Sequence, residues 1–308
     1  MSHASFKTEY LCAGVAILLW STIAAAAKLL QSSLDSMQIL AGASLLAFVF
    51  LFFVCLFTGR LRELRRLRAK DWPILFGVGL LGTFAYNLFL YLGIERMQAS
   101  QAFIINYLWP VLIVLFACLI LKEPLTARKL LAIGLSFLGV VIVTAGGDLL
   151  HIEPQTLSGA LFCVGAAVSY GLFSVLNKRL HYEKYTSMML FYAFSAVLSF
   201  GWLAVRGGWF APDLPQLAGL VWTGVGTYAI PYTAWALALD RGDTAKISNL
   251  AYITPLLSLV WTALLLHEPL SPYSVLGLVF ILAGVLIQLR DRTKKEGKTD
   301  ETTAEKQI

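Results

Sequence analysis

Residues 106–110 read NYLWP and place an amide, a phenol, an indole and a proline inside a long apolar run. Pro110 lacks an amide hydrogen, so within a helix the backbone carbonyl of Asn106 would lose its usual partner. A freed carbonyl beside an amide side chain offers acceptors and a donor, and Trp109 offers an aromatic face. This chemistry is noncovalent recognition of a small molecule. The alternative is a tolerated kink in which Asn106 ties two helices together.

A second stretch, YITP, ends at Pro255 and repeats the tyrosine and the proline with the spacing of the first. The amide and the indole have no counterpart there. We therefore predict that Pro110 and Pro255 are hinge or gate residues, because the backbone device is duplicated. Asn106 and Trp109 are the better candidates for substrate contacts.

Further aromatic and amide side chains lie in the middle of other apolar segments. Polar groups in lipid are costly unless they face the interior of a bundle, so they mark a candidate pathway. Aromatic residues also serve as interfacial anchors, but a mid-segment position favours cavity lining. Several rings around one cavity would suit a planar aromatic molecule or an organic cation. The candidate substrate-binding residues are Trp20, Tyr86, Asn87, Tyr91, Asn106, Trp109, Tyr170, Tyr232, Trp235 and Tyr252.

Three charged residues near segment ends are also candidates. Lys28 could pair with a substrate carboxylate, or its ammonium could reach back to the membrane surface. Glu123 and Glu268 each precede a proline, and we interpret them as gate residues or as structural helix ends. The middle of each apolar segment lacks Asp and Glu, so the sequence indicates no carboxylate site for proton exchange.

Motifs for catalysis are absent from the sequence. It contains no GxxxxGK[ST] loop, no HExxH and no cysteine–histidine cluster, so neither nucleotide hydrolysis nor a metal site is predicted. The four cysteines lie in apolar segments without paired spacing, which indicates small apolar packing residues. We therefore predict no catalytic residue, no metal and no cofactor.

The elements that must position these residues are membrane-spanning helices. The chain has 308 residues, of which 58% are hydrophobic and 14% charged, and its mean hydropathy is +0.73. A soluble domain could not cover so much apolar surface, and the apolar blocks have the length of about 20 residues that a helix needs to cross a bilayer. We predict an all-α integral membrane protein with ten transmembrane helices, near 10–30, 36–58, 72–94, 98–121, 127–146, 157–177, 187–205, 216–239, 245–266 and 272–289.

The basic residues predict the topology. If both termini are cytoplasmic, 21 of the 24 lysine and arginine residues fall on the cytoplasmic side, and the others are Lys28, Arg96 and Arg206. This asymmetry follows the positive-inside rule. The net charge of +6 therefore indicates topology, with contact to anionic lipids as a secondary role and no nucleic acid partner.

The chain contains an internal duplication. A shift of 145 residues aligns NYLWP with AYITP, KEPL at 122–125 with HEPL at 267–270, and Gly139 with Gly284. Each unit holds five predicted helices, and an odd number inverts the second unit in the membrane. We predict a cytoplasmic amino terminus over 1–9, repeat 1 over 10–146, inverted repeat 2 over 157–289 and a disordered basic cytoplasmic tail over 290–308.

Ten helices in two inverted units, with xEPL after each fourth helix, resemble the drug/metabolite transporter superfamily in its ten-helix EamA-type branch. AILLWST at 16–22, NYLWP at 106–110, NK at 177–178 and YITP at 252–255 resemble the bacterial aromatic amino acid exporters. The resemblance covers residues 10–290. It implies a multi-pass carrier of the bacterial inner membrane.

The expected function is a small-molecule carrier that works by alternating access and exports aromatic amino acids or similar amphipathic metabolites. One alternative is a carrier of a non-aromatic amino acid, a sugar-type metabolite or a cationic drug. A more distant one is a membrane enzyme or scaffold, which the lack of catalytic motifs disfavours. The lipid bilayer and a small-molecule substrate are the expected partners, and the sequence leaves monomer or dimer open.

Overall fold

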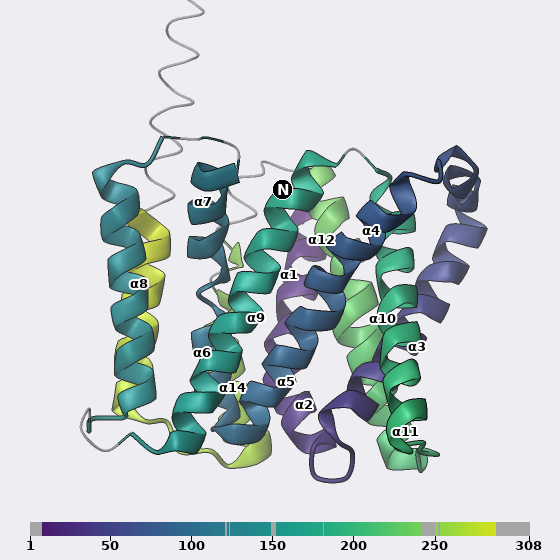
Figure 1. Ribbon diagram of the computed structural model, residues 1–308. Coiled ribbons are helices and arrows are strands. Elements are labelled where there is room, and N and C mark those ends of the chain that lie inside the picture. Colours follow the sequence, from purple (N-terminus) through teal and green to yellow (C-terminus); the bar gives the residue numbers. More distant parts are fainter. Residues whose placement is uncertain are drawn as a thin grey trace, which may run out of the picture.

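The computed structural model describes residues 8–120, 122, 124–148, 152–180, 182–241, 250–251 and 253–287, and every regular element in these ranges is a helix (Figure 1). Most are α-helical, η1 is a 3₁₀-helix, and η2 and η3 are π-helical turns. The elements are α1 (Thr8–Ser21), α2 (Ile23–Leu30), α3 (Ser36–Phe57), η1 (Arg60–Arg66), α4 (Asp71–Gly79), η2 (Leu80–Ala85), α5 (Tyr86–Arg96), α6 (Ala99–Asn106), α7 (Trp109–Ile120), α8 (Ala127–Ala145), α9 (Pro154–Arg179), α10 (Lys184–Arg206), α11 (Leu214–Val221), η3 (Trp222–Ala229), α12 (Ile230–Arg241), α14 (Ile253–Leu266) and a last helix, Pro272–Ile287.

Several of these elements join into helical spans of membrane length. Within the described ranges, seven spans are long and apolar enough to cross a bilayer, and Ile253–Leu266 and Pro272–Ile287 are shorter apolar helices. An all-helical, multi-pass membrane protein is thereby confirmed, whereas the number of crossings and the side of the termini stay predictions. The seven spans are Thr8–Leu30, Ser36–Phe57, Asp71–Arg96, Ala99–Ile120, Ala127–Ala145, Pro154–Asn177 and Lys184–Arg206.

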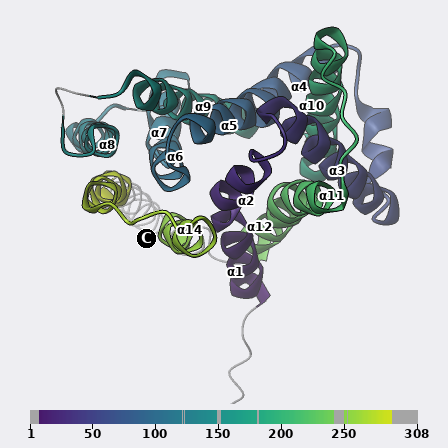
Figure 2. The ribbon, with the colours of Figure 1, turned by 90° about the horizontal axis from the view of Figure 1, so that it is seen from below.

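The spans pack side by side with their axes roughly along one direction (Figure 1). Pairs that are distant in the sequence carry much of the packing: α3 lies against α10, α5 against α9, and α1 against α12. Seen from below, α8 and the last helix lie together at one side of the bundle, and α3 and α10 lie at the other (Figure 2). Large apolar side chains such as Leu119, Leu161 and Val197 are exposed on the outside, which suits contact with lipid.

Close contacts between helices occur at glycines that the 145-residue shift had paired. A Cβ atom on Gly139 of α8 would lie 2.6 Å from the carbonyl oxygen of Gly277, and one on Gly284 would lie 2.5 Å from that of Ala132. Both contacts belong to the interface between α8 and the last helix. Small residues let membrane helices approach to backbone contact, so larger side chains at either glycine would push this pair apart.

Two spans are interrupted where polar or proline residues disturb the helix. The hydroxyls of Ser21 and Thr22 donate to the carbonyls of Leu18 and Leu19, and α1 gives way to α2 at this point. The span 99–120 breaks after Asn106, just before Pro110, as the proline predicts. In both cases the break lies at mid-span.

Two π-helical turns occur elsewhere: η2 lies in the span Asp71–Arg96, and η3 lies between α11 and α12. Gly82 in η2 lies against the ring of Phe173, and Gly224 in η3 lies against the backbone of Ala43, so close that a side chain on either glycine would clash. The hydroxyl of Thr83 also donates to the carbonyl of Phe191 at 3.0 Å. π-Turns widen a helix locally and are frequent at functional sites.

The two ends of the bundle are tied by different polar contacts. At one end, which we call the Glu183 end, Glu183 pairs with Arg60, and the Tyr182 hydroxyl donates to Asp71 at 2.8 Å. Desolvation, together with the hydrogen bond to Asp71 and its charge, raises the pKa of Tyr182. The other end carries α2, the start of α6 and the start of α11, and we call it the Glu268 end. In Figure 1 it is the lower end.

Candidate functional site

A cavity of about 180 Å³, here called the central cavity, lies inside the bundle. The breaks and π-turns described above border it, because both interrupted spans and both π-turns contribute residues to its wall. In the described part of the chain, 18 residues line the cavity; ten of the 18 are aromatic, and none of the 18 is charged. The lining residues are Trp20, Ile23, Gly82, Tyr86, Asn87, Phe103, Asn106, Tyr107, Trp109, Tyr170, Met188, Tyr192, Thr227, Tyr228, Tyr232, Trp235, Ala251 and Thr254.

The structure brings most of the predicted substrate contacts to this cavity. Eight of the ten line it: Trp20, Tyr86, Asn87, Asn106, Trp109, Tyr170, Tyr232 and Trp235. Tyr91 lies behind the wall, where its hydroxyl hydrogen-bonds that of Tyr228. Tyr252 lies outside the described residues. That these side chains contact a substrate stays a prediction.

The aromatic rings contact one another in groups along the wall. On one stretch, the Tyr170 ring lies 4.9 Å from Tyr86 and 5.3 Å from Trp109, measured between centroids. Elsewhere Tyr192 and Tyr228 are stacked at 5.1 Å with an interplanar angle of 11°. Rings that hold one another in tilted and stacked pairs present fixed faces and edges to a ligand.

The wall also holds two buried polar atoms without a hydrogen-bond partner. Asn106 donates from Nδ2 to the Tyr86 hydroxyl at 3.2 Å, and its Oδ1 is unpaired. The Thr254 hydroxyl is also unpaired, and both residues are at most 2% exposed. An unpaired buried polar group costs about 1–3 kcal/mol, so a ligand that pairs with these atoms recovers that energy. Asn106 Oδ1 requires a donor, such as an ammonium group.

Tyr107 links the two proline-bearing stretches. Its hydroxyl donates to the carbonyl of Ala251, which lies four residues before Pro255 and so cannot receive a helical hydrogen bond from that proline. The amide of Thr254 also donates to that carbonyl, at 3.0 Å. This carbonyl is thus paired inside the protein, and the helix break at Tyr107 is joined to the residues just before α14.

Two of the predicted charged candidates, Lys28 and Glu268, do not line the cavity. The Lys28 ammonium donates to the carbonyls of Ile94 at 2.6 Å and Met97 at 3.2 Å, so it caps the end of α5. Positive groups are favourable at a helix carboxyl end. Lys28 does not line the central cavity, and its predicted pairing with a substrate carboxylate is untested.

Glu268 binds the amino end of α6. Its carboxylate accepts hydrogen bonds from the amides of Ala99 at 2.7 Å and Ser100 at 3.0 Å, and from the Ser100 hydroxyl at 2.7 Å. A carboxylate at this position satisfies amides that lack helical partners and complements the helix dipole. The contact closes α14 against α6 at the Glu268 end. Glu123, its counterpart in the predicted first repeat, lies outside the described residues.

Several wall residues were not among the predicted contacts. Tyr192 and Met188 reach the cavity from α10, and Tyr228 and Thr227 reach it from η3. Their mid-span position was the one available signal, because a tyrosine or methionine in an apolar helix is equally compatible with lipid contact. What decides is the packing of α10 and η3 around the cavity, which no local pattern encodes.

Noncovalent binding is the chemistry that these side chains provide. In the described part of the chain, no three His, Cys, Asp or Glu side chains lie close enough together to hold a metal ion. All four cysteines are free thiols. The wall offers aromatic faces, phenol and threonine hydroxyls, and two amide side chains, groups that interact with ligands through noncovalent contacts.

Comparison with known proteins gives a match to one family. The EamA-like transporter family matches residues 7–145 and again residues 157–290. The two matched ranges together cover almost the whole chain, and each covers about one of its halves.

Individual relatives are transporters by name. The aromatic amino acid exporter YddG of Salmonella typhimurium is 27% identical over 283 residues, which span 89% of this chain and 94% of the relative. A probable terminal-alkyne amino-acid exporter of Streptantibioticus cattleyicolor is 26% identical, over 72% of this chain and 75% of the relative. Other relatives are named uncharacterized transporters.

A crystal structure shares the fold. It superposes with a TM-score of 0.67 at 24% identity, over 92% of this chain and 97% of the other.

Proposed function

We propose a function for this chain, which belongs to the EamA-like transporter family. It is a carrier that exports aromatic amino acids or similar amphipathic metabolites across the bacterial inner membrane. The observation that carries the proposal is the central cavity, which is rich in aromatic rings, lacks charged lining residues and lies where the two proline-bearing stretches meet.

The cavity suits an aromatic amino acid in two ways. The rings of Trp109, Tyr170 and Tyr86 offer edges and faces against which a planar side chain packs. Asn106 Oδ1 is an acceptor for the ammonium group of a zwitterion, and the Thr254 hydroxyl can pair with its carboxylate. The name of the Salmonella relative supports the same substrate class.

We propose that the chain crosses the membrane ten times, with both termini in the cytoplasm, and that its two halves form an inverted repeat. Such a repeat makes transport by alternating access possible. The double family match, the paired glycines in the α8 interface and the mid-span breaks support two equivalent halves. In carriers, substrate sites lie near the midplane at the interface of such repeats, and interrupted helices border them. The halves exchange conformations and expose the site to each side in turn.

Glu268 is the gate residue in this proposal. Its bonds to α6 hold the Glu268 end closed, and with cytoplasmic termini this end faces outside. Along α14, Ser258 comes between Thr254 of the cavity wall and Glu268 in the sequence, and it is buried with an unpaired hydroxyl. Water would satisfy that hydroxyl when α6 and α14 separate, so Ser258 destabilises the closed state and lies on the proposed exit route.

The test is efflux from proteoliposomes loaded with labelled phenylalanine, tyrosine or tryptophan. We expect each to leave faster than from liposomes without protein. Efflux equal to that of empty liposomes for all three would contradict the aromatic substrate.

A second candidate is a carrier of non-aromatic amino acids, which the relative named for a terminal-alkyne amino acid favours. Competition separates the two candidates. If unlabelled leucine and an alkynyl amino acid inhibit phenylalanine efflux more strongly than unlabelled tryptophan does, the non-aromatic substrate class is correct.

A further inference from the structure

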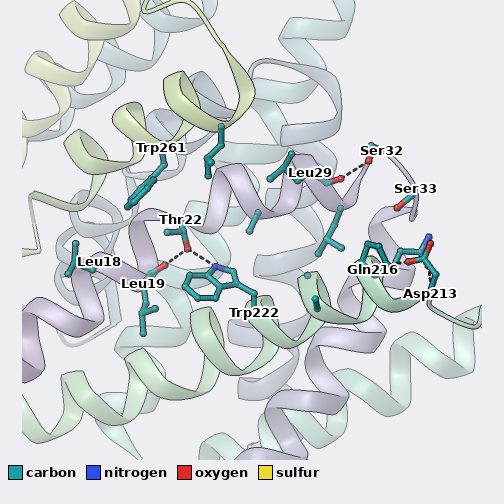
Figure 3. Close-up of a pocket in the computed structure, with 16 residues that line it drawn as sticks. Leu18, Leu19, Thr22, Leu29, Ser32, Ser33, Asp213, Gln216, Trp222 and Trp261 are labelled. Carbon is teal, nitrogen blue, oxygen red and sulfur yellow. Dashed lines mark hydrogen bonds between the residues drawn. The ribbon is translucent and has the colours of Figure 1, made fainter.

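A second hollow, here called the lateral groove, lies on the outside of the bundle (Figure 3). Its volume is about 1060 Å³. The floor is formed by the break between α1 and α2, and the walls come from α11 with the start of η3 and from α14. Two indoles fix this arrangement: Trp222 donates to the Thr22 hydroxyl at 3.0 Å, and Trp261 donates to the Ser21 hydroxyl at 2.9 Å.

The lateral groove is separate from the central cavity. The two share no lining residue, because Trp20 and Ile23 face the cavity whereas Leu19 and Thr22 face the groove. The broken first span is therefore a wall between them. A ligand bound in the groove would therefore not occupy the central cavity.

The groove opens toward lipid. Leu18, Leu29 and Leu265 on its rim are about half exposed, at 51%, 49% and 48%. Along the first span it extends from Leu18 to Leu30, a path of about 18 Å at 1.5 Å per helical residue, which includes the break between α1 and α2. Half of a bilayer core is about 15 Å thick. The groove therefore has the length of a single leaflet, from mid-membrane to the Glu268 end.

At that end the lining becomes polar, with Ser32, Ser33, Gln216 and Asp213. The carboxylate of Asp213 accepts a hydrogen bond from the Gln216 amide at 2.8 Å and thereby caps α11. Among the described residues that line the groove, Asp213 is the one that is charged. An anionic headgroup would be repelled here, whereas a cationic one would be attracted.

We propose that the lateral groove binds one ethanolamine phospholipid. Its acyl chain lies along the leucines of the first span, and its ammonium group donates to Asp213. A primary ammonium has three donors, so it can bond the carboxylate and the serine hydroxyls together. The trimethylammonium group of a choline lipid has no such donor, so we expect the groove to bind choline lipids less tightly. A glycerol lipid, which has a net negative charge, should bind least tightly.

The experiment is native mass spectrometry of the full chain, incubated with an equimolar mixture of synthetic palmitoyl-oleoyl phosphatidylethanolamine, phosphatidylcholine and phosphatidylglycerol. We expect one retained lipid per chain, with ethanolamine preferred over glycerol roughly tenfold, the effect of one charge-assisted hydrogen bond. Asp213→Asn should remove this preference because the carboxylate charge is lost. Asparagine still caps the helix, so the start of α11 should keep its structure. Ala26→Trp, which fills the floor, should reduce retention of all three lipids.

The matched control is Asp35→Asn. Asp35 also caps a helix with a capping box at the same end of the bundle, but it does not line the groove. It should keep the ethanolamine preference. Equal retention of the three lipids by the wild type, or the same preference in both aspartate variants, would overturn the proposal. If the wild type appears as a dimer in the mass spectra and Ala26→Trp abolishes that dimer, the groove instead holds a second copy of the chain. None of these results depends on what the central cavity carries.

Discussion

Asn106 combines one hydrogen bond with one unpaired oxygen at the wall of the central cavity. We expect Asn106→Ala to raise the half-saturation concentration for phenylalanine efflux roughly tenfold, because the lost acceptor contributes about one hydrogen bond of recognition. The measurement is the concentration dependence of efflux from proteoliposomes at matched protein content. Asn177→Ala, the same change on α9 away from the cavity, is the control. Equal half-saturation values in both variants would make Asn106 a packing residue.

Trp109 forms an aromatic part of the wall through its contacts with Tyr170 and Tyr107. Trp109→Ala should lower the preference for phenylalanine over leucine by up to about tenfold, since one ring contact contributes up to about 1.5 kcal/mol. The ratio of the two efflux rates is the measurement. Trp202→Ala removes an indole that is 50% exposed on the outside and should leave the ratio unchanged. If the two variants behave alike, the Trp109 ring does not select the substrate.

Single residues were predictable from the sequence where residue type and depth in the span agreed. Asn106 and Trp109 stood out because an amide and an indole beside a proline are costly in lipid. Tyr192 and Tyr228 did not, since their place in the wall depends on how α10 and η3 pack. Lys28 is the opposite case: its place near the end of a span was read from the sequence, but the carbonyls of Ile94 and Met97 that it caps, at the end of α5, have no signature there.

Pro110 acts at the scale of the element, where α6 meets α7. Pro110→Ala should restore a hydrogen-bond donor and make the span more continuous. We expect the turnover rate to fall several-fold with little change in half-saturation, because the hinge affects state exchange more than binding. Pro154→Ala, in the first turn of α9 where proline is tolerated, is the control. An unchanged turnover rate for Pro110→Ala would contradict the hinge.

Glu268 holds α14 to α6, so its loss should open the Glu268 end. The reporter is Ser258→Cys in a chain whose four native cysteines are replaced by serine, with Val260→Cys on the lipid face of α14 as the control. Adding Glu268→Gln should speed the reaction of the Ser258 reporter with a membrane-impermeant thiol reagent, because a neutral side chain binds the α6 amides less strongly.

The Val260 reporter should stay unreactive in both backgrounds. Two inert reporters, or equal rates with and without Glu268→Gln, would show that Glu268 caps a helix end without gating. A further comparison with Glu95→Gln at the same end separates the loss of the α6 contact from the loss of a negative charge.

Some helix breaks can be predicted from the local sequence, whereas others depend on contacts from other helices in the folded bundle. The break before Pro110 follows from the missing amide hydrogen. The break at Ser21 and Thr22 does not, because serine and threonine are common in intact membrane helices. Two indoles from other spans bond these hydroxyls and hold the break. The π-turns likewise accompany close approaches of α9 and α3 to glycines, which only the assembled bundle shows.

For the whole molecule, hydropathy predicted the membrane class and most span limits. The predicted segments 36–58, 98–121 and 127–146 correspond to observed spans Ser36–Phe57, Ala99–Ile120 and Ala127–Ala145. This agreement arises because a bilayer imposes one length and one polarity on every crossing. The order in which spans pack was not predictable, since lipid-facing and protein-facing surfaces are both apolar.

The proposed mechanism joins these scales: aromatic walls bind the ligand, hinges and a gate move, and two inverted halves exchange. The most direct test is counterflow in proteoliposomes that hold a high concentration of unlabelled phenylalanine, with a trace of labelled phenylalanine added outside. A carrier with one alternating site predicts a transient accumulation of label above its final level, reduced in Trp109→Ala. Uptake equal to that of empty liposomes, or a monotonic approach to the final level, would contradict the account.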